Sequence, residues 1–135
     1  MGGYIMEIRR FEDLGIWQEA RELCTRVRDL TADGGFAKDF KFRDQIRSSS
    51  GSIMDCIAEG FERDGNKEFI QFLSFAKGSC GETRSQSYRA LDYEYVTQKD
   101  FEDLLERTVR LSRRISSFMH YLKESGLKGR KYDHR

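Results

Sequence analysis

The sequence predicts an all-α protein, an antiparallel up-down-up-down four-helix bundle formed by residues 1–126. Three observations lead to this fold class. The 135-residue chain contains no proline, whereas a β-sandwich or barrel of this length normally places several prolines in turns and edge strands. Apolar residues recur at helical spacing in four long segments. The connections between these segments are short, which makes successive long helices antiparallel neighbours.

The first expected helix covers about residues 13–31 and ends at the turn Ala32-Asp33-Gly34-Gly35. The two glycines of this turn can adopt the left-handed conformation that commonly follows a helix. The apolar stripe of the segment consists of Ile16, Trp17, Ala20, Leu23, Cys24, Val27 and Leu30.

Two further helices are expected over about residues 38–61 and 67–94, separated by the break Asp64-Gly65-Asn66. Asn66 is a favourable N-cap for the later helix, because its side chain can accept a hydrogen bond from a free backbone N–H group. The stripe of the earlier segment comprises Phe42, Ile46, Ser49, Ile53, Cys56, Ile57 and Gly60. That of the later segment comprises Phe69, Ile70, Phe72, Leu73, Ala76, Cys80, Thr83, Ser87, Ala90 and Leu91.

The fourth expected helix opens with Thr97-Gln98-Lys99-Asp100, a capping box with aspartate in place of glutamate. It continues to Gly126, and residues 127–135 are expected to form a polar, flexible tail. The apolar stripe comprises Phe101, Leu104, Leu105, Thr108, Leu111, Ile115, Phe118, Met119 and Leu122.

Small residues interrupt the second and third expected helices at Ser48-Ser49-Ser50-Gly51-Ser52 and at Lys77-Gly78-Ser79-Cys80-Gly81. Each glycine inside a helix costs about 1 kcal/mol relative to alanine. Close backbone approach between the two helices would offset this cost. The alternative is a recess or a subunit contact at the same level.

Charge and cysteine usage narrow the class of protein. Lys and Arg total 24 against 23 Asp and Glu, so a histone-like or strongly acidic protein is excluded and any nucleic-acid role needs a local patch. No segment reaches the roughly 20 apolar residues of a membrane span, and the first residues hold no apolar run of signal-peptide length. Cys24, Cys56 and Cys80 are widely spaced without a CxxC pair, which favours buried reduced thiols over a metal or redox site. We therefore expect a cytoplasmic protein with no membrane partner.

Two basic clusters are candidate phosphate contacts. Arg107, Arg110 and Arg114 recur at i, i+3 and i+7, so they share one face of the fourth helix. Because the first half of this helix is acidic, favourable interaction with the helix dipole is an alternative reason for the arginines. The second cluster lies at the start of the second helix and comprises Lys38, Lys41 and Arg43, with Arg47 one turn further on.

Glu59 and Glu82 are candidates for structural ion pairs. A carboxylate on a mostly apolar stripe needs a cationic partner, and Arg47, Arg63 and Lys77 are available. The expected role is to hold the second and third helices in register, with a ligand or subunit contact as the alternative. General acid–base catalysis ranks last because no histidine or second nucleophile accompanies the carboxylates, so no catalytic residue is predicted.

Other chemical sites find no support in the sequence. His120 and His134 are not preceded by the Glu-x-x-His spacing of di-iron bundles, so no metal site is expected. The glycines around Gly78 do not form a phosphate loop, and no cofactor is expected. Tyr88, Tyr93, Tyr95 and Phe101 are expected to cap one end of the bundle or to form a subunit contact, with stacking on unpaired bases as the alternative.

Several sequence blocks resemble one protein family. These are Asp13-Leu14, Trp17-Gln18-Glu19-Ala20, Gln45-Ile46-Arg47, Ser52-Ile53, Ile57-Ala58-Glu59-Gly60-Phe61-Glu62-Arg63, the segment 68–79 and Glu82. The chain is similar over about residues 11–124 to the four-helix bundle proteins encoded in intervening sequences of bacterial large-subunit ribosomal RNA genes, also called S23 ribosomal protein-like. In one place it departs from the family. Met54-Asp55-Cys56 replaces the family's Pro-Ser-Asn, which should straighten a kink and remove a polar group.

The resemblance implies a ring-shaped homopentamer that binds RNA or DNA and has no established catalysis. A ring repeats each basic patch, so avidity could give a nearly neutral chain useful affinity for nucleic acid. We expect a non-enzymatic protein that binds structured RNA through Arg107, Arg110, Arg114, Lys38, Lys41 and Arg43. The alternative is an interaction scaffold for a protein partner such as a polymerase or reverse transcriptase.

Overall fold

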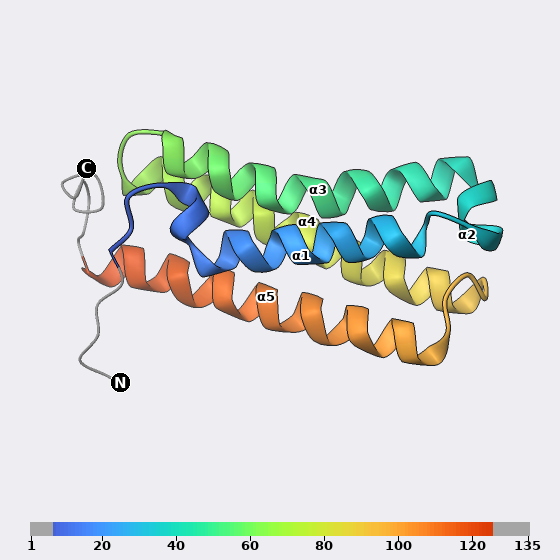
Figure 1. The fold of residues 1–135 in the computed structure, drawn as a ribbon. Helices are drawn as coiled ribbons and strands as arrows, with labels where there is room; N and C mark the ends of the chain where they lie inside the picture. Colours follow the sequence, from blue (N-terminus) through green and yellow to red (C-terminus); the bar gives the residue numbers. More distant parts are fainter. Residues whose placement is uncertain (1–6, 126–135) are drawn as a thin grey trace.

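The computed structural model describes residues 7–125, and within this range every regular element is a helix. Four long helices lie side by side, and a short helix closes one end of the molecule (Figure 1). The all-α class is therefore confirmed, while the expected tail at residues 127–135 lies outside the described residues. The elements are η1 (Phe11–Asp13), α1 (Gly15–Leu30), α2 (Gly34–Lys38), α3 (Phe40–Glu62), α4 (Asn66–Asp92) and α5 (Gln98–Ser125).

The four long helices share one hydrophobic core. Helix α3 packs against α1 and α4, and α5 packs against the same two helices from the other side. The residues that close this core are those at helical spacing in the sequence, such as Leu23 in α1, Ile53 in α3, Leu73 in α4 and Ile115 in α5, all with no exposed surface. Helix α3 runs without interruption through Met54-Asp55-Cys56, as expected for a segment without proline.

Helix α2 was not expected from the sequence. Gly34 adopts a left-handed φ of 69°, as expected for the turn, but the chain then forms this five-residue helix instead of a loop. Phe36 holds it in place, because its ring is buried and lies 5.1 Å from the rings of both Phe42 and Tyr95. Five residues are too few for a periodic apolar pattern to appear in the sequence.

The beginnings of α4 and α5 show how well capping could be predicted. Asn66 is not the N-cap of α4; Gly65 occupies that position with φ 87°. Asn66 is instead the first residue of the helix, and its Nδ2 donates a hydrogen bond to the Leu122 carbonyl oxygen at 3.3 Å. At α5 the Thr97 hydroxyl accepts a hydrogen bond from the Asp100 backbone N–H at 3.0 Å, which is the N-cap half of the predicted capping box, while Asp100 Oδ1 accepts from Arg26 at 2.8 Å.

Serine side chains and one glycine set the contact between α3 and α4. The Ser49 hydroxyl lies 2.9 Å from the Thr83 hydroxyl and donates to Gln86 Oε1 at 2.6 Å, and Ser79 donates to Ser52 at 3.1 Å. The two helices also approach closely at Gly60, where an added Cβ would lie 2.6 Å from Phe72 Cβ. The two small-residue blocks therefore supply hydrogen bonds, and the close approach occurs one or more turns away from them.

Candidate nucleic-acid interface

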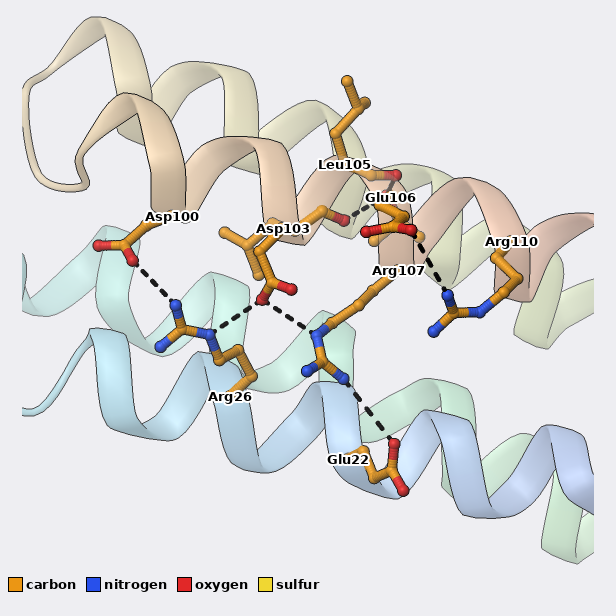
Figure 2. A network of polar contacts seen from close by, with 10 residues as sticks. Glu22, Arg26, Asp100, Asp103, Leu105, Glu106, Arg107 and Arg110 are labelled. Carbon is orange, nitrogen blue, oxygen red and sulfur yellow. Dashed lines mark hydrogen bonds and ion pairs between the residues drawn. The ribbon is translucent and has the colours of Figure 1, made fainter.

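We call Arg107, Arg110 and Arg114 the α5 stripe. These arginines face α1 and form ion pairs with acidic residues. Arg107 Nε lies 3.0 Å from Asp103 Oδ2, and its Nη1 lies 3.8 Å from Glu22 Oε1 (Figure 2). On the other side of Asp103, Arg26 of α1 contacts Asp100 at 2.8 Å and Asp103 at 3.0 Å. We call this set the α1–α5 ladder, and its members are Glu19, Glu22, Arg26, Asp100, Asp103, Glu106, Arg107, Arg110 and Arg114.

Glu19 forms the end of the ladder near the start of α1. Its side chain is 20% exposed and forms ion pairs with both Arg110, at 3.5 Å, and Arg114. The Arg114 guanidinium covers the start of α1, because a Cβ added to Gly15 would lie 2.6 Å from Arg114 Nη2. A phosphate at this surface would therefore compete with carboxylates already in place. A phosphate-binding role for Arg107, Arg110 and Arg114 stays a prediction.

Asp103 is the ladder carboxylate with an altered pKa. Burial disfavours its charged form, but hydrogen bonds from Arg26 and Arg107 outweigh burial and hold the pKa of Asp103 below its ordinary value. The hydrogen bond that Arg26 donates to Asp103 correspondingly raises the pKa of Arg26. Asp103 is therefore charged at neutral pH, and its hydrogen bond from Arg26 joins α5 to α1.

Acid is expected to weaken this junction. Because the pKa of Asp103 is lower in the folded state, its contribution is complete above the unfolded-state value of about 4 and is lost as the pH falls through the folded-state value. Asp103→Asn should thus reduce the loss of unfolding free energy between about pH 5 and pH 2. Urea denaturation followed by circular dichroism measures this. Asp92→Asn is the matched control, since that exposed carboxylate forms no ion pair within the described part of the chain, and equal acid profiles for the two variants would contradict the expectation.

The second basic cluster is arranged differently from the ladder. Lys38 ends α2 and Lys41 lies in the first turn of α3, and both side chains are exposed. Neither forms an ion pair with a carboxylate among residues 7–125. Arg43 donates from Nε to Asp44 at 3.0 Å and from Nη1 to the Ala37 carbonyl oxygen at 3.1 Å. We call Lys38, Phe40, Lys41 and Arg43 the α2–α3 surface.

Aromatic residues accompany the α2–α3 surface. Phe40 is 65% exposed, and the Arg43 guanidinium lies over its ring at 4.9 Å. On the inner side, Phe42 packs against Tyr93 and Tyr95 at 5.8 and 6.2 Å, so the expected aromatic cap at this end of the molecule includes these two tyrosines. Tyr88 instead packs on Phe101 at 4.8 Å, away from that group.

The residues predicted to form ion pairs between the second and third helices lie near the surface. Arg63 contacts Glu59 at 3.0 Å and Glu68 at 3.4 Å, so the contact that reaches α4 is made through Glu68. Glu82 is exposed and accepts a hydrogen bond from Gln86 at 3.4 Å.

The other two cations of that prediction do not contact Glu82. Arg47 donates to the hydroxyl and the carbonyl oxygen of Thr31, at 2.8 and 3.1 Å, and so caps the C-terminus of α1. Lys77 is exposed on α4 and forms no ion pair among the described residues. Glu59 and Glu82 are exposed because neither belongs to the buried stripe of its helix. Each only precedes a buried residue, Gly60 and Thr83 respectively.

Within residues 7–125 Cys80 is buried as expected, whereas Cys24 and Cys56 are only partly buried. No group of three or more His, Cys, Asp or Glu side chains there could hold a metal ion, and His120 is exposed; His134 lies outside the described residues. Burial raises the pKa of the Cys80 thiol to about 11, and its Sγ donates to the Thr108 carbonyl oxygen at 3.2 Å. None of the described helices is long and apolar enough to cross a membrane.

The spacing of Arg107, Arg110 and Arg114 correctly predicts that they share one face of a helix. Their ion-pair partners on α1 were not predicted. A signal was present. Read forwards, Glu19, Glu22 and Arg26 give acid, acid, base at i, i+3 and i+7. Followed from its C-terminus towards its N-terminus, α5 carries basic residues at Arg110 and Arg107 and then acidic residues at Asp103 and Asp100. This pattern predicts ion pairs between two helices that run in opposite directions, once they are known to be neighbours.

Comparisons with known proteins agree on one family. Residues 12–117 match the model of the family described as 23S rRNA-intervening sequence protein. The fold is similar, with a TM-score of 0.71, to the crystal structure of a protein of unknown function from the S23 ribosomal protein family of Bacteroides thetaiotaomicron. That similarity covers 77% of this chain and 97% of the other at 21% sequence identity. No curated protein matches the chain.

Proposed function

Because the chain belongs to the 23S rRNA-intervening sequence protein family, we propose that it is a non-enzymatic protein that binds structured RNA. The α2–α3 surface is the proposed contact. The observation that carries the proposal is that Lys38 and Lys41 are exposed beside an exposed aromatic ring and form no ion pair within the described residues. A lysine without an ion pair is available to a phosphate group, because binding then releases counterions and breaks no existing ion pair.

The geometry divides the six predicted phosphate contacts into two sets. Arg107, Arg110 and Arg114 already bind carboxylates of α1 and α5. In the proposal they stabilise the packing of α5 on α1, and Lys38 and Lys41 contact the RNA. Arg43 packs on the Phe40 ring, because hydrogen bonds to Asp44 and to the Ala37 carbonyl oxygen hold its guanidinium there.

The proposal includes an up-down-up-down bundle that assembles into a homo-oligomer. The α1–α5 ladder supports opposite directions for α1 and α5, because residues later in α1 pair with residues earlier in α5. The family resemblance suggests five copies, and a sedimentation mass equal to one 15.9 kDa chain would contradict assembly.

Charge reversal at the α2–α3 surface tests the RNA contact. We expect Lys38→Glu with Lys41→Glu to weaken binding of a folded RNA hairpin by about tenfold or more at 100 mM salt. The slope of log affinity against log salt, which is negative, should become less steep by about 2, one unit for each phosphate that the variant no longer binds. Fluorescence anisotropy across roughly 50–300 mM salt gives both quantities.

Lys67→Glu with Lys123→Glu is the matched control, because it makes the same change in net charge. These lysines are exposed at the start of α4 and the end of α5, at the end of the molecule opposite α2 (Figure 1). Equal losses in the two double variants would show only a general effect of charge. Absence of binding by the wild type even at 50 mM salt would overturn the proposal and favour the protein-scaffold alternative.

A further inference from the structure

We infer that the α2–α3 surface recognises unpaired nucleotides, with a base stacked on Phe40 and the adjoining phosphates at Lys38 and Lys41. The inference rests on the proposed RNA binding and specifies which feature of the RNA is bound. It predicts that a hairpin loop binds this surface and that a fully paired stem does not.

The first argument is the exposure of Phe40. At 65% it is the most exposed large hydrophobic side chain in the described part of the chain. Its position at the start of α3 contrasts with that of Phe42, two residues later, which is 3% exposed and packs in the aromatic cap. A helix this well anchored by Phe42 has no folding reason to present a second aromatic ring to water.

The second argument is the guanidinium next to that ring. Arg43 Cζ lies 4.9 Å from the Phe40 ring centroid, and two hydrogen bonds fix the guanidinium there. The guanidinium thus covers one face of the ring, and a base can stack on the opposite face, as bases do on aromatic side chains in single-stranded nucleic-acid sites. Inside a base-paired stem the bases stack on one another and present only their edges, so only a terminal pair could stack on this ring, and the hairpin and duplex probes share such a blunt end.

The third argument is that the backbone beneath Phe40 is held in place. Asp39 Oδ1 accepts from the Phe42 N–H at 3.3 Å, and Asp39 Oδ2 accepts from the Tyr95 hydroxyl at 2.8 Å. The acidic residue nearest to Phe40 in sequence is thus bound to α3 and to the α4–α5 connection. Lys38 lies two residues before Phe40 and Lys41 one residue after it, and both lysine side chains are exposed.

Affinity for two RNAs with the same stem tests the inference. One probe is a hairpin with an unpaired loop, and the other is the blunt duplex of that stem without a loop. Phe40→Ala should weaken hairpin binding by about tenfold, equivalent to about 1.4 kcal/mol, while leaving duplex binding and the salt slope unchanged. The matched control is Phe75→Ala, which removes a half-exposed ring from α4 and should change neither affinity.

A spectroscopic readout detects stacking directly. Trp17 is the only tryptophan, so Trp17→Phe with Phe40→Trp places a single indole on the α2–α3 surface. Its fluorescence should be quenched by the hairpin and not by the duplex. In Trp17→Phe with Phe75→Trp, the hairpin should cause no quenching.

The outcomes separate the inference from the proposed function. If Phe40→Ala has no effect, or weakens hairpin and duplex equally, base stacking is overturned, while a loss in the Lys38 and Lys41 variant still supports RNA binding. If the wild type binds neither RNA, both fail. Binding of the hairpin that depends on Phe40 and on both lysines is the result that supports both.

Discussion

Gly60→Ala is expected to lower the free energy of unfolding by about 1–3 kcal/mol, although alanine is the better helix former. The added methyl group would lie 2.6 Å from Phe72 Cβ and 3.0 Å from Phe69 Cδ1. Phe72 Cβ is attached directly to the α4 backbone, so the clash cannot be relieved by rotating a side chain. Helix α4 would have to move away from α3, and the packing of Phe69 on Phe61 and Phe118 would loosen.

Gly78→Ala is the matched control for this substitution. It makes the same chemical change inside a helix, but at a position where the new methyl group meets no atom within 4 Å. The helix preference of alanine then acts alone, and the variant should be more stable by about 0.5–1 kcal/mol. Urea denaturation of both variants, measured at the same protein concentration, gives the comparison. Changes of the same sign at the two positions would contradict the close α3–α4 approach at Gly60.

The helical elements could be predicted because local signals agreed with one another. The four apolar stripes, the absence of proline and the Thr97 cap identified each long helix to within two or three residues of its observed bounds. These signals depend on sequence neighbours alone, so they need no knowledge of the tertiary structure. Helix α2 and the position of Asn66 were missed because each depends on a contact with a distant segment, Tyr95 in one case and Leu122 in the other.

The candidate site was harder to predict for the same reason. A basic stripe on a helix has the same sequence pattern whether it faces solvent or a neighbouring acidic stripe. Arg107 and Arg110 are distinguished from Lys38 and Lys41 only by the carboxylates of α1 that lie opposite them. The small-residue blocks show the same ambiguity, because Ser49 makes buried hydrogen bonds while Gly78 contacts nothing.

The distribution of ion pairs therefore bears on function. A nearly neutral chain can present positive charge only where its acidic residues are engaged elsewhere. On α1 and α5, acids and bases engage one another across the ladder. At the α2–α3 surface, Asp39 is bound to Tyr95 and Asp44 to Arg43, and the two lysines are left unpaired among the described residues. The net charge of +1 therefore does not exclude a local positive surface, and the proposed RNA contact is placed at these two lysines.

Reversing the charge of Arg114 tests whether the α5 stripe is structural. Arg114→Glu should lower the free energy of unfolding by about 1–2 kcal/mol, because it removes the ion pair with Glu19 and places two carboxylates side by side. Glu19→Arg should be destabilising by a similar amount, since it brings a third positive charge to Arg110 and Arg114. The two substitutions together restore an ion pair of opposite orientation and should recover at least half of the summed loss.

Stability and RNA affinity, measured on the same four proteins, decide between the two roles of the stripe. A structural role requires coupling between positions 19 and 114 in a double-mutant cycle, together with hairpin affinity and a salt slope equal to those of the wild type in the folded variants. A phosphate-binding role requires the reverse. In that case Arg114→Glu would be stable yet would bind RNA more weakly, and Glu19→Arg would strengthen binding by adding a cation. Because the Glu19 side chain is only 20% exposed and forms ion pairs with two arginines, we expect the first result.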